Sequence, residues 1–136
     1  LDELPKNEEF IAQKFIQNSF DYRVVVAGEK ILICYKRIRQ SGGKAHQNNV
    51  SQGAQPEFVR GDELPHEVRE LAIKAAKLIG RELSGVDVMR NDEAGSHVVL
   101  EVNFNFATPV FEEFGVAAID EYYKRLDNYF DDLTTH

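Results

Sequence analysis

The chain has 136 residues, of which 43% are hydrophobic, and its formal net charge at pH 7 is −7. These values fit a single folded domain with a modest core. The acidic balance argues against a nucleic-acid partner, because phosphate recognition needs clustered Lys and Arg. No apolar stretch approaches the roughly 20 residues that cross a bilayer, and no signal peptide is recognisable. We therefore expect no membrane partner.

The first regular elements that the pattern predicts are strands. Residues 9–16 have the pattern of a short mixed strand. Residues 22–27 and 30–37 are rich in β-branched side chains and flank a Gly-Glu pair at 28–29, which predicts a tight hairpin. Residues 40–55 are polar, rich in Gly, Asn and Gln, and without an apolar period, which indicates either disorder or a functional loop.

The single cysteine, Cys34, lies inside the second of these runs. A thiol in apolar surroundings is expected to be buried and inert rather than nucleophilic. One cysteine excludes an internal disulfide and is compatible with a reducing compartment. We therefore expect a cytoplasmic protein.

Two helices are predicted further along the chain. Residues 65–79 begin with Pro65, which suits a first helical turn, carry an apolar stripe, and are followed by Gly80 as a C-cap. Residues 116–130 form a second amphipathic stretch near the end of the chain.

A second hairpin is predicted between the helices, from residues 86–89 and 97–103 joined by the polar turn 91–95. With a loop of about five residues, Asp87 lies opposite or diagonal to Glu101. Strict alternation places two sets of side chains on opposite faces of the second strand: Val98, Leu100 and Val102 on one, and His97, Val99, Glu101 and Asn103 on the other.

In this predicted hairpin, two carboxylates and an amide are expected to lie close together. Like charges that face each other across strands are destabilising unless a positive charge lies between them. Oxygen ligands from Asp, Glu and Asn suit a hard cation such as Mg2+. Asp87, Glu101 and Asn103 are therefore candidate metal ligands, with a solvated polar face carrying two unrelated acids as the alternative.

The order of elements predicts an α+β fold, in which an antiparallel sheet is covered on one face by two helices. Glu101 and Asn103 would point from the open face. Lys36 and Arg37, at the end of their strand, are candidates to neutralise nucleotide phosphates, with a charge-protected edge strand as the alternative. Gln47, Asn48 and Asn49 offer donors that can touch phosphate, with a mobile solvated loop as the alternative.

Taken in order, these motifs resemble the C-terminal half of an ATP-grasp ligase, closest to the RimK-like group of amino-acid ligases. Residues 10–16 look like the hinge strand beside adenine, and Asp21-Tyr22-Arg23 looks like the Asp-x-Arg that follows it. Residues 49–53 resemble the Asn-Val-x-x-Gly loop ahead of the family's alanine-rich helix. Residues 85–87 together with 100–103 resemble the magnesium hairpin.

The resemblance implies a set of roles for residues of this chain. Hinge contacts to adenine would come from Lys14, Phe15 and Ile16, the ribose contact from Asp21, and phosphate contacts from Gln47, Asn48 and Asn49. The metal, Mg2+ or alternatively Mn2+, would be held by Asp87, Glu101 and Asn103. No residue is assigned a catalytic role.

The resemblance also implies an ATP-dependent reaction. A carboxylate substrate is activated as an acylphosphate, and an amine substrate then displaces phosphate to form an amide. The remaining domains of the same polypeptide would complete the site. The chain begins at Leu1 rather than Met, and we expect it to be a single-domain fragment of a longer chain that is inactive alone.

Three positions depart from the family pattern: Lys14 replaces a usual Glu, Gln47 replaces a usual Arg, and residues 104–107 replace Ser-Ser-Pro-Gly. These departures keep two alternatives open, a non-catalytic nucleotide- or metal-binding module and an interaction domain for a basic partner. The sequence identifies neither substrate, and it leaves a homo-oligomer open.

Overall fold

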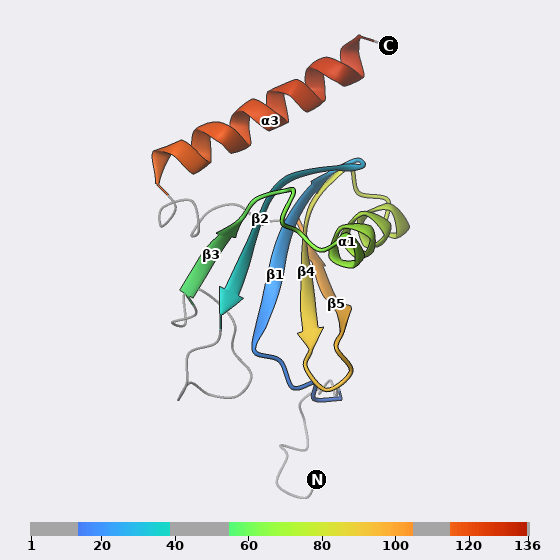
Figure 1. Ribbon diagram of the computed structural model, residues 1–136. Coiled ribbons are helices and arrows are strands. Elements are labelled where there is room, and N and C mark those ends of the chain that lie inside the picture. Colours follow the sequence, from blue (N-terminus) through green and yellow to red (C-terminus); the bar gives the residue numbers. More distant parts are fainter. Residues whose placement is uncertain (1–13, 39–54, 105–114, 136) are drawn as a thin grey trace, which may run out of the picture.

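The computed structural model describes residues 14–38, 55–104 and 115–135. Within them, a five-stranded antiparallel sheet has the strand order β3-β2-β1-β4-β5 and carries two helices (Figure 1). The α+β class is therefore confirmed. The elements in chain order are β1 (Phe20–Ala27), β2 (Lys30–Ile38), β3 (Gln55–Val59), α1 (His66–Leu78), β4 (Leu83–Asn91), β5 (Ser96–Asn103) and α3 (Val116–Thr134).

The central hairpin, β1–β2, forms where β-branched residues flank Gly28. This glycine has a φ of +56°, a conformation that suits a residue without a Cβ. Its N–H donates to the backbone oxygen of Glu82 over 2.7 Å, which ties the turn to the start of β4. The predicted hairpin is confirmed, and Cys34 lies in it with 1% of its surface exposed.

Helix α1 begins and ends where the sequence indicates. Pro65 is the N-cap residue and Ile79 the C-cap residue. Beyond the helix, Gly80 has a φ of +67°, its N–H bonds to the Lys77 oxygen, and the N–H of Arg81 bonds to the Ala76 oxygen. These two hydrogen bonds form a Schellman cap, which fixes the backbone that leads into β4.

The two faces of the sheet carry separate cores. One core lies between the sheet and α1; it contains Tyr22, Val24, Val26, Cys34, Val59, Leu64, Val68, Ala72, Ala76, Val86 and Val88. The other lies between the sheet and α3; it contains Val25, Ala27, Leu32, Ile33, Tyr122 and Tyr129. Alternate residues of β1 belong to different cores, so the helices lie on opposite faces. The predicted placement of both helices on one face is corrected accordingly.

The second hairpin, β4–β5, contains a bulge that strict alternation does not predict. Asp87 pairs with Glu101 but Val88 pairs with Val99, so Leu100 is the extra residue. Val99 and Val102 therefore both pack against the α1 core. The predicted faces are corrected: Val99 does not share a face with Glu101, because the bulge reverses the alternation between them.

Other predictions fall at the margins of the described residues. Residues 14–16 lie outside any strand, and the rest of the strand predicted at 9–16 lies outside the described residues. The polar segment 40–55 lies outside them as well, except that Gln55 begins the unpredicted edge strand β3. In the part of the chain that the structure describes, no helix combines the length and apolarity needed to span a bilayer.

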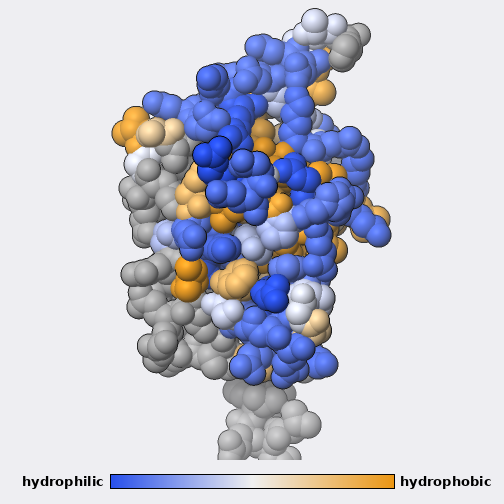
Figure 2. Space-filling model, viewed as in Figure 1, coloured by the Kyte–Doolittle hydropathy of each residue, from blue (hydrophilic) through white to orange (hydrophobic). Residues whose placement is uncertain are grey.

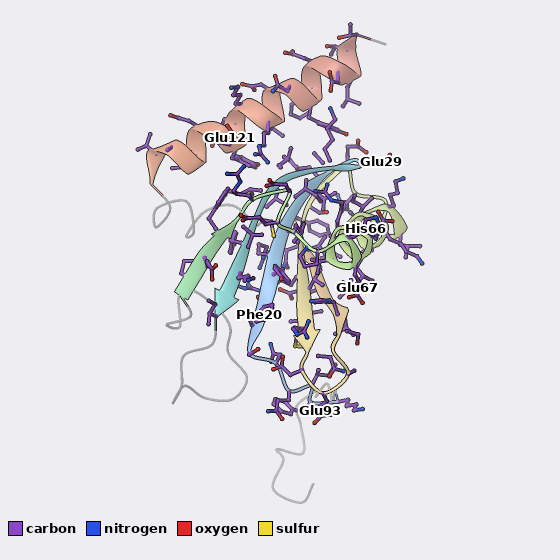
Figure 3. All side chains as sticks on the ribbon, viewed as in Figure 1. Phe20, Glu29, His66, Glu67, Glu93 and Glu121 are labelled. Carbon is purple, nitrogen blue, oxygen red and sulfur yellow. The ribbon has the colours of Figure 1, made fainter. Side chains whose placement is uncertain are left out.

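The sheet has two distinct ends. Figure 3 places Glu29, in the β1–β2 turn, at one end and Glu93, in the β4–β5 turn, at the other. Because β4 begins and β5 ends beside the β1–β2 turn, Leu83 and Asn103 belong to that same end. Figure 2 shows that the side facing the viewer is largely hydrophilic, with apolar groups between the polar ones.

The β1–β2 turn gives the first testable prediction. A Cβ at Gly28 would lie 2.9 Å from the Tyr129 hydroxyl and 3.0 Å from the Glu82 carboxylate, which are hydrogen-bonded to each other. We expect Gly28→Ala to lower the free energy of unfolding by more than the about 1–2 kcal/mol that positive φ costs a residue with a Cβ. Urea denaturation measures the loss.

The matched control is Gly95→Ala, because Gly95 also has a positive φ of +67° but a Cβ there meets nothing within 4 Å. It reports backbone strain alone. Equal losses in the two variants would contradict the packing of Tyr129 against the turn.

Candidate functional site

A row of polar side chains crosses the sheet on the face opposite α1. Tyr35 on β2 pairs with Arg23 on β1, Arg23 pairs with Asp87 on β4, and Asp87 pairs with Glu101 on β5. The antiparallel register thus brings together four residues from four strands. Asp21 and Arg37 face each other one pair further along the same face.

Two arginines hold the Asp87 carboxylate. Arg23 Nη2 donates to Asp87 Oδ2 over 3.0 Å, and Arg23 Nε lies 2.5 Å from Oδ1 without hydrogen-bond alignment. Arg37 Nη2 lies 3.1 Å from Asp87 Oδ2, and its Nε donates to Asp21 Oδ1 over 2.5 Å. Asp87 is 2% exposed and Arg37 5%. Charges this deeply buried are tolerated only when each has a partner.

On its other side Asp87 meets a second acid. Burial, the largest cause, raises the pKa of Asp87 to about 7. A hydrogen bond to Glu101 and the charge of Asp21 also raise this pKa, and together these effects outweigh the charges of Arg37 and Arg23, which lower it. The Asn103 amide donates to Glu101 Oε1 over 2.7 Å, and this bond is the largest cause that lowers the pKa of Glu101. Of the two acids, Asp87 is therefore the one whose environment favours the protonated form.

Burial and nearby charges also shift the pKa values of the groups around Asp87. Burial alone would lower the pKa of Arg37, but the Asp87 and Asp21 carboxylates hold it above its usual value. Burial raises the pKa of Tyr35 to about 12, and it raises the pKa of Cys34 to about 12 as well. Tyr35 is therefore a neutral hydrogen-bonding group, and Cys34 is inert, as the sequence predicts.

The donor set fits a hard divalent cation. Asp87, Glu101 and Asn103 provide carboxylate and amide oxygens on one face, and Glu101 is exposed to solvent. Mg2+ commonly uses one or two protein carboxylates and completes its shell with water and phosphate oxygens. Two carboxylates paired across neighbouring strands mark a point where a cation relieves repulsion. Among the described residues, no group of three or more His, Cys, Asp or Glu side chains could hold a metal.

The structure brings together only some of the predicted nucleotide contacts. Asp21 and Arg37 join the buried network. Lys36 lies over the Phe20 and Tyr22 rings on the α1 side, at 5.3 and 5.9 Å, away from that network. Gln47, Asn48 and Asn49 lie outside the described residues.

The predicted hinge residues lie near the opposite end of the sheet from Asn103. Lys14 and Phe15 are exposed and Ile16 is half-buried in the irregular segment before β1. The next residue, Gln17, accepts a 3.0 Å backbone hydrogen bond from Asp92 in the β4–β5 turn.

Arg23 is the site residue that the sequence reasoning did not select. It makes the closest contact to Asp87, yet the sequence singles it out only as part of the Asp-x-Arg motif. Alternation along β1 places Arg23 on the same face as Asp21, and an acid that faces Glu101 needs a positive charge beside it. Only the pairing of β1 with β4, strands more than 50 residues apart in the chain, brings Arg23 to Asp87.

Solved ATP-grasp ligases share this fold. PsnB, in complex with a phosphomimetic variant of its minimal precursor, Mg and ADP, aligns with a TM-score of 0.57 and 21% identity over 81% of this chain and 35% of that one. A RiPP-associated ATP-grasp ligase from Chryseobacterium gregarium, bound to ADP and to leader and core peptides, aligns with a TM-score of 0.57 and 14% identity over 81% and 33%.

A family model described as a RimK-like ATP-grasp domain matches residues 1–122. The chain belongs to this family. Probable alpha-L-glutamate ligases from Alkalilimnicola ehrlichii and Vibrio atlanticus are similar to it, with 33% identity over 99 residues and 36% over 95. These alignments cover 71% and 68% of this chain but 31% and 29% of the relatives, so the chain spans about a third of their length.

The arginine network gives a second prediction. Arg37→Ala leaves two buried carboxylates short of a partner, and we expect it to lower the free energy of unfolding by about 3–5 kcal/mol. The matched control, Lys36→Ala, removes a neighbouring cation that only lies over aromatic rings, with an expected loss of about 1 kcal/mol or less. Urea denaturation at pH 7 measures both, and similar losses would contradict the network.

The raised pKa of Asp87 gives a third prediction. Its folded-state pKa of about 7 lies above its ordinary 3.8, so between these values the folded chain keeps a proton that the unfolded chain releases. The free energy of unfolding contributed by this group therefore falls as pH rises from about 4 to about 7. We expect Asp87→Asn to remove this slope in metal-free buffer.

Asp62→Asn is the control, since Asp62 is an exposed acid paired with Arg60. Denaturation curves from pH 4 to 8 compare each variant with the parent chain. A pH dependence that Asp87→Asn leaves intact would contradict the raised pKa of Asp87.

Proposed function

We propose that this chain is the C-terminal subdomain of an ATP- and Mg2+-dependent ligase that joins a carboxylate to an amine. One observation carries the proposal. The two acids and the amide on β4 and β5 lie on one sheet face, where the paired carboxylates of Asp87 and Glu101 produce a repulsion that a cation would relieve. Family membership and solved relatives that hold Mg and ADP support it.

In the proposed reaction, a carboxylate oxygen attacks the terminal phosphorus of ATP, and ADP departs with the electron pair of the broken bond. The amine nitrogen then attacks the carbonyl carbon of the acylphosphate. Phosphate leaves, and the nitrogen loses a proton to give the amide. Catalysis of this kind depends on positioning and charge neutralisation.

The residues of this chain would provide part of that positioning. Glu101 and Asn103, with Asp87 behind them, would hold Mg2+, which supplies positive charge to the nucleotide phosphates when bound. Arg23 and Arg37 would fix the orientation of Asp87 through the contacts they make on the sheet. Their role is to support the ligands from a second layer of hydrogen bonds.

The remaining nucleotide contacts are part of the same proposal. Lys14, Phe15 and Ile16 would lie along adenine, and residues 47–49 would approach the phosphates. The carboxylate and amine would be bound together with the rest of a longer polypeptide, since the chain spans only about a third of its relatives.

Ligand-dependent stability tests the proposal. A ligand that binds only the folded chain at a hundredfold excess over its dissociation constant raises the free energy of unfolding by about 2.7 kcal/mol. We expect Mg-ADP to stabilise the chain in thermal melts, Mg2+ or ADP alone to do less, and Glu101→Gln to abolish the effect.

Glu93→Gln is the matched control, because Glu93 lies in the exposed β4–β5 turn (Figure 3). It should keep the full response to Mg-ADP. A melting temperature that millimolar Mg-ADP leaves unchanged would contradict the proposal and favour an interaction domain instead.

Turnover gives a further prediction. We expect the 136-residue chain alone to release no ADP from ATP in the presence of carboxylates and amines, because it provides only the metal hairpin and part of the nucleotide site. A coupled ADP assay measures the rate. ATP-dependent amide formation by the chain alone would refute its assignment as a subdomain.

A further inference from the structure

Helix α3 has two apolar rows, and the sheet covers only one of them. Figure 1 shows α3 crossing the end of the sheet beside the β1–β2 turn. The covered row contains the buried Tyr122 and Tyr129, with Ile119 and Leu126 packed against the same core. The second row, which we call the outer stripe, consists of Val116, Tyr123 and Phe130.

The outer stripe is exposed along the whole helix. Because an α-helix has 3.6 residues per turn, positions seven apart lie nearly in line, so the three side chains share one side of α3. Their exposed fractions are 72%, 56% and 50% in chain order. An apolar row that adjoins a packed row and stays in solvent is typical of an interaction surface.

Buried rings hold the exposed rings in place. The Tyr123 ring meets the Tyr122 ring edge-on with 5.2 Å between centroids, and the Phe130 ring meets the Tyr129 ring at 5.7 Å. Tyr129 is fixed in turn by its hydrogen bond to Glu82 at the start of β4. A partner that packs on the outer stripe therefore restricts little further motion of these rings, which favours binding.

The acids of α3 fall into two sets. Glu121 accepts a hydrogen bond from Arg125, and Asp132 pairs with Lys30 of the β1–β2 hairpin. The second set has no side-chain hydrogen bond or ion pair to any described residue, and we call it the outer acids: Asp120, Asp127 and Asp131.

The outer acids border the outer stripe and leave a surplus of negative charge beside it. Asp127 and Asp131 are four residues apart, a spacing at which like charges on a helix repel each other. Asp131 lies in the last turn, where the helix dipole disfavours an acid, and that turn has no basic residue. Lys124 is the one cation on this side of α3. A cationic partner would relieve both effects.

The same charges disfavour other occupants. A second copy that docked through α3 would bring its own outer acids against these, and the net charge of −7 adds to the repulsion. Anionic lipid surfaces and nucleic acids would be repelled as well. The complementary ligand is a helix with one apolar row and with Lys or Arg beside that row.

We propose that the outer stripe of α3 binds a basic amphipathic helix supplied by another protein. Apolar side chains of that helix would pack on the exposed rings, and its cations would pair with the outer acids. Tyr123 and Phe130 lie past residue 122, where the match to the family model ends. None of these residues belongs to the proposed metal or nucleotide contacts, so the proposal is independent of the proposed function.

A fluorescent peptide tests the proposal, since the chain contains no tryptophan. The probe is a helical peptide of about 18 residues, which spans the roughly 21 Å length of the outer stripe. It has Leu and one Trp on one face and Lys on the other. We expect saturable binding with a blue shift of the Trp emission, and weaker binding as salt is added. A scrambled peptide and one with Glu in place of Lys should each bind at least about tenfold more weakly.

Variants of the outer stripe separate apolar docking from general attraction. Tyr123→Ser and Phe130→Ser should each weaken binding of the Lys peptide about fivefold, because each removes an exposed ring from the contact. The matched control is Leu78→Ser on α1, where an apolar side chain is 77% exposed. It should leave binding unchanged. All three sites are exposed, and circular dichroism checks that the fold is retained.

A pair of triple variants tests the charges. Neutralising the outer acids together, by Asp120→Asn, Asp127→Asn and Asp131→Asn, should weaken binding about tenfold. The control removes the same charge from exposed acids elsewhere, by Asp62→Asn, Glu70→Gln and Glu93→Gln. Binding by that control should stay within about twofold of the parent chain.

Several results would overturn the proposal. These are full binding by both outer-stripe variants, equal losses in the two triple variants, or equal binding of the scrambled peptide. Sedimentation equilibrium and flotation with vesicles of phosphatidylcholine and phosphatidylglycerol examine the other occupants. Self-association or vesicle binding that Tyr123→Ser abolishes would assign the outer stripe to a second copy or to a membrane instead.

Discussion

The buried carboxylate of Asp87 is the constraint on which the rest of the site depends. It has arginines on one side and the acid of Glu101 on the other. An ionised carboxylate at 2% exposure is costly without partners. The arginines of β1 and β2 reduce that cost, while on the β5 side the Asp87 carboxylate faces a second acid, Glu101. The same electrostatics that hold the sheet together therefore leave one edge of the network suited to a cation.

The strand pairing explains why this network is possible at all. Antiparallel neighbours place Arg23 beside Asp87, and Asp21 beside Arg37, so that charges alternate across the face. The bulge at Leu100 completes the arrangement, because it turns Glu101 onto the charged face while Val99 and Val102 remain in the α1 core. Without the extra residue, alternation would place either the valines or the acid on an unfavourable face.

The end of the sheet beside the β1–β2 turn joins the sheet to both helices. Gly28, Glu82 and Tyr129 join the turn, the start of β4 and α3, while the cap of α1 fixes the backbone of Arg81 just before β4. The hairpin that carries the proposed metal ligands is therefore anchored at this end to both helices. Sites on regular elements are held more accurately than sites on loops, which suits a reaction that depends on positioning.

Local sequence determined the hairpins, both helices and the buried, inert state of Cys34, because hydrophobic period, proline and glycine act over a few residues. It also identified Asp87, Glu101 and Asn103 as one oxygen-rich group, since they share a hairpin. Only the tertiary structure placed the helices on opposite faces, reversed the alternation at Leu100 and brought Arg23 to Asp87. Those outcomes depend on strand order and register, which are set by contacts between segments distant in the chain and leave no short-range pattern to read.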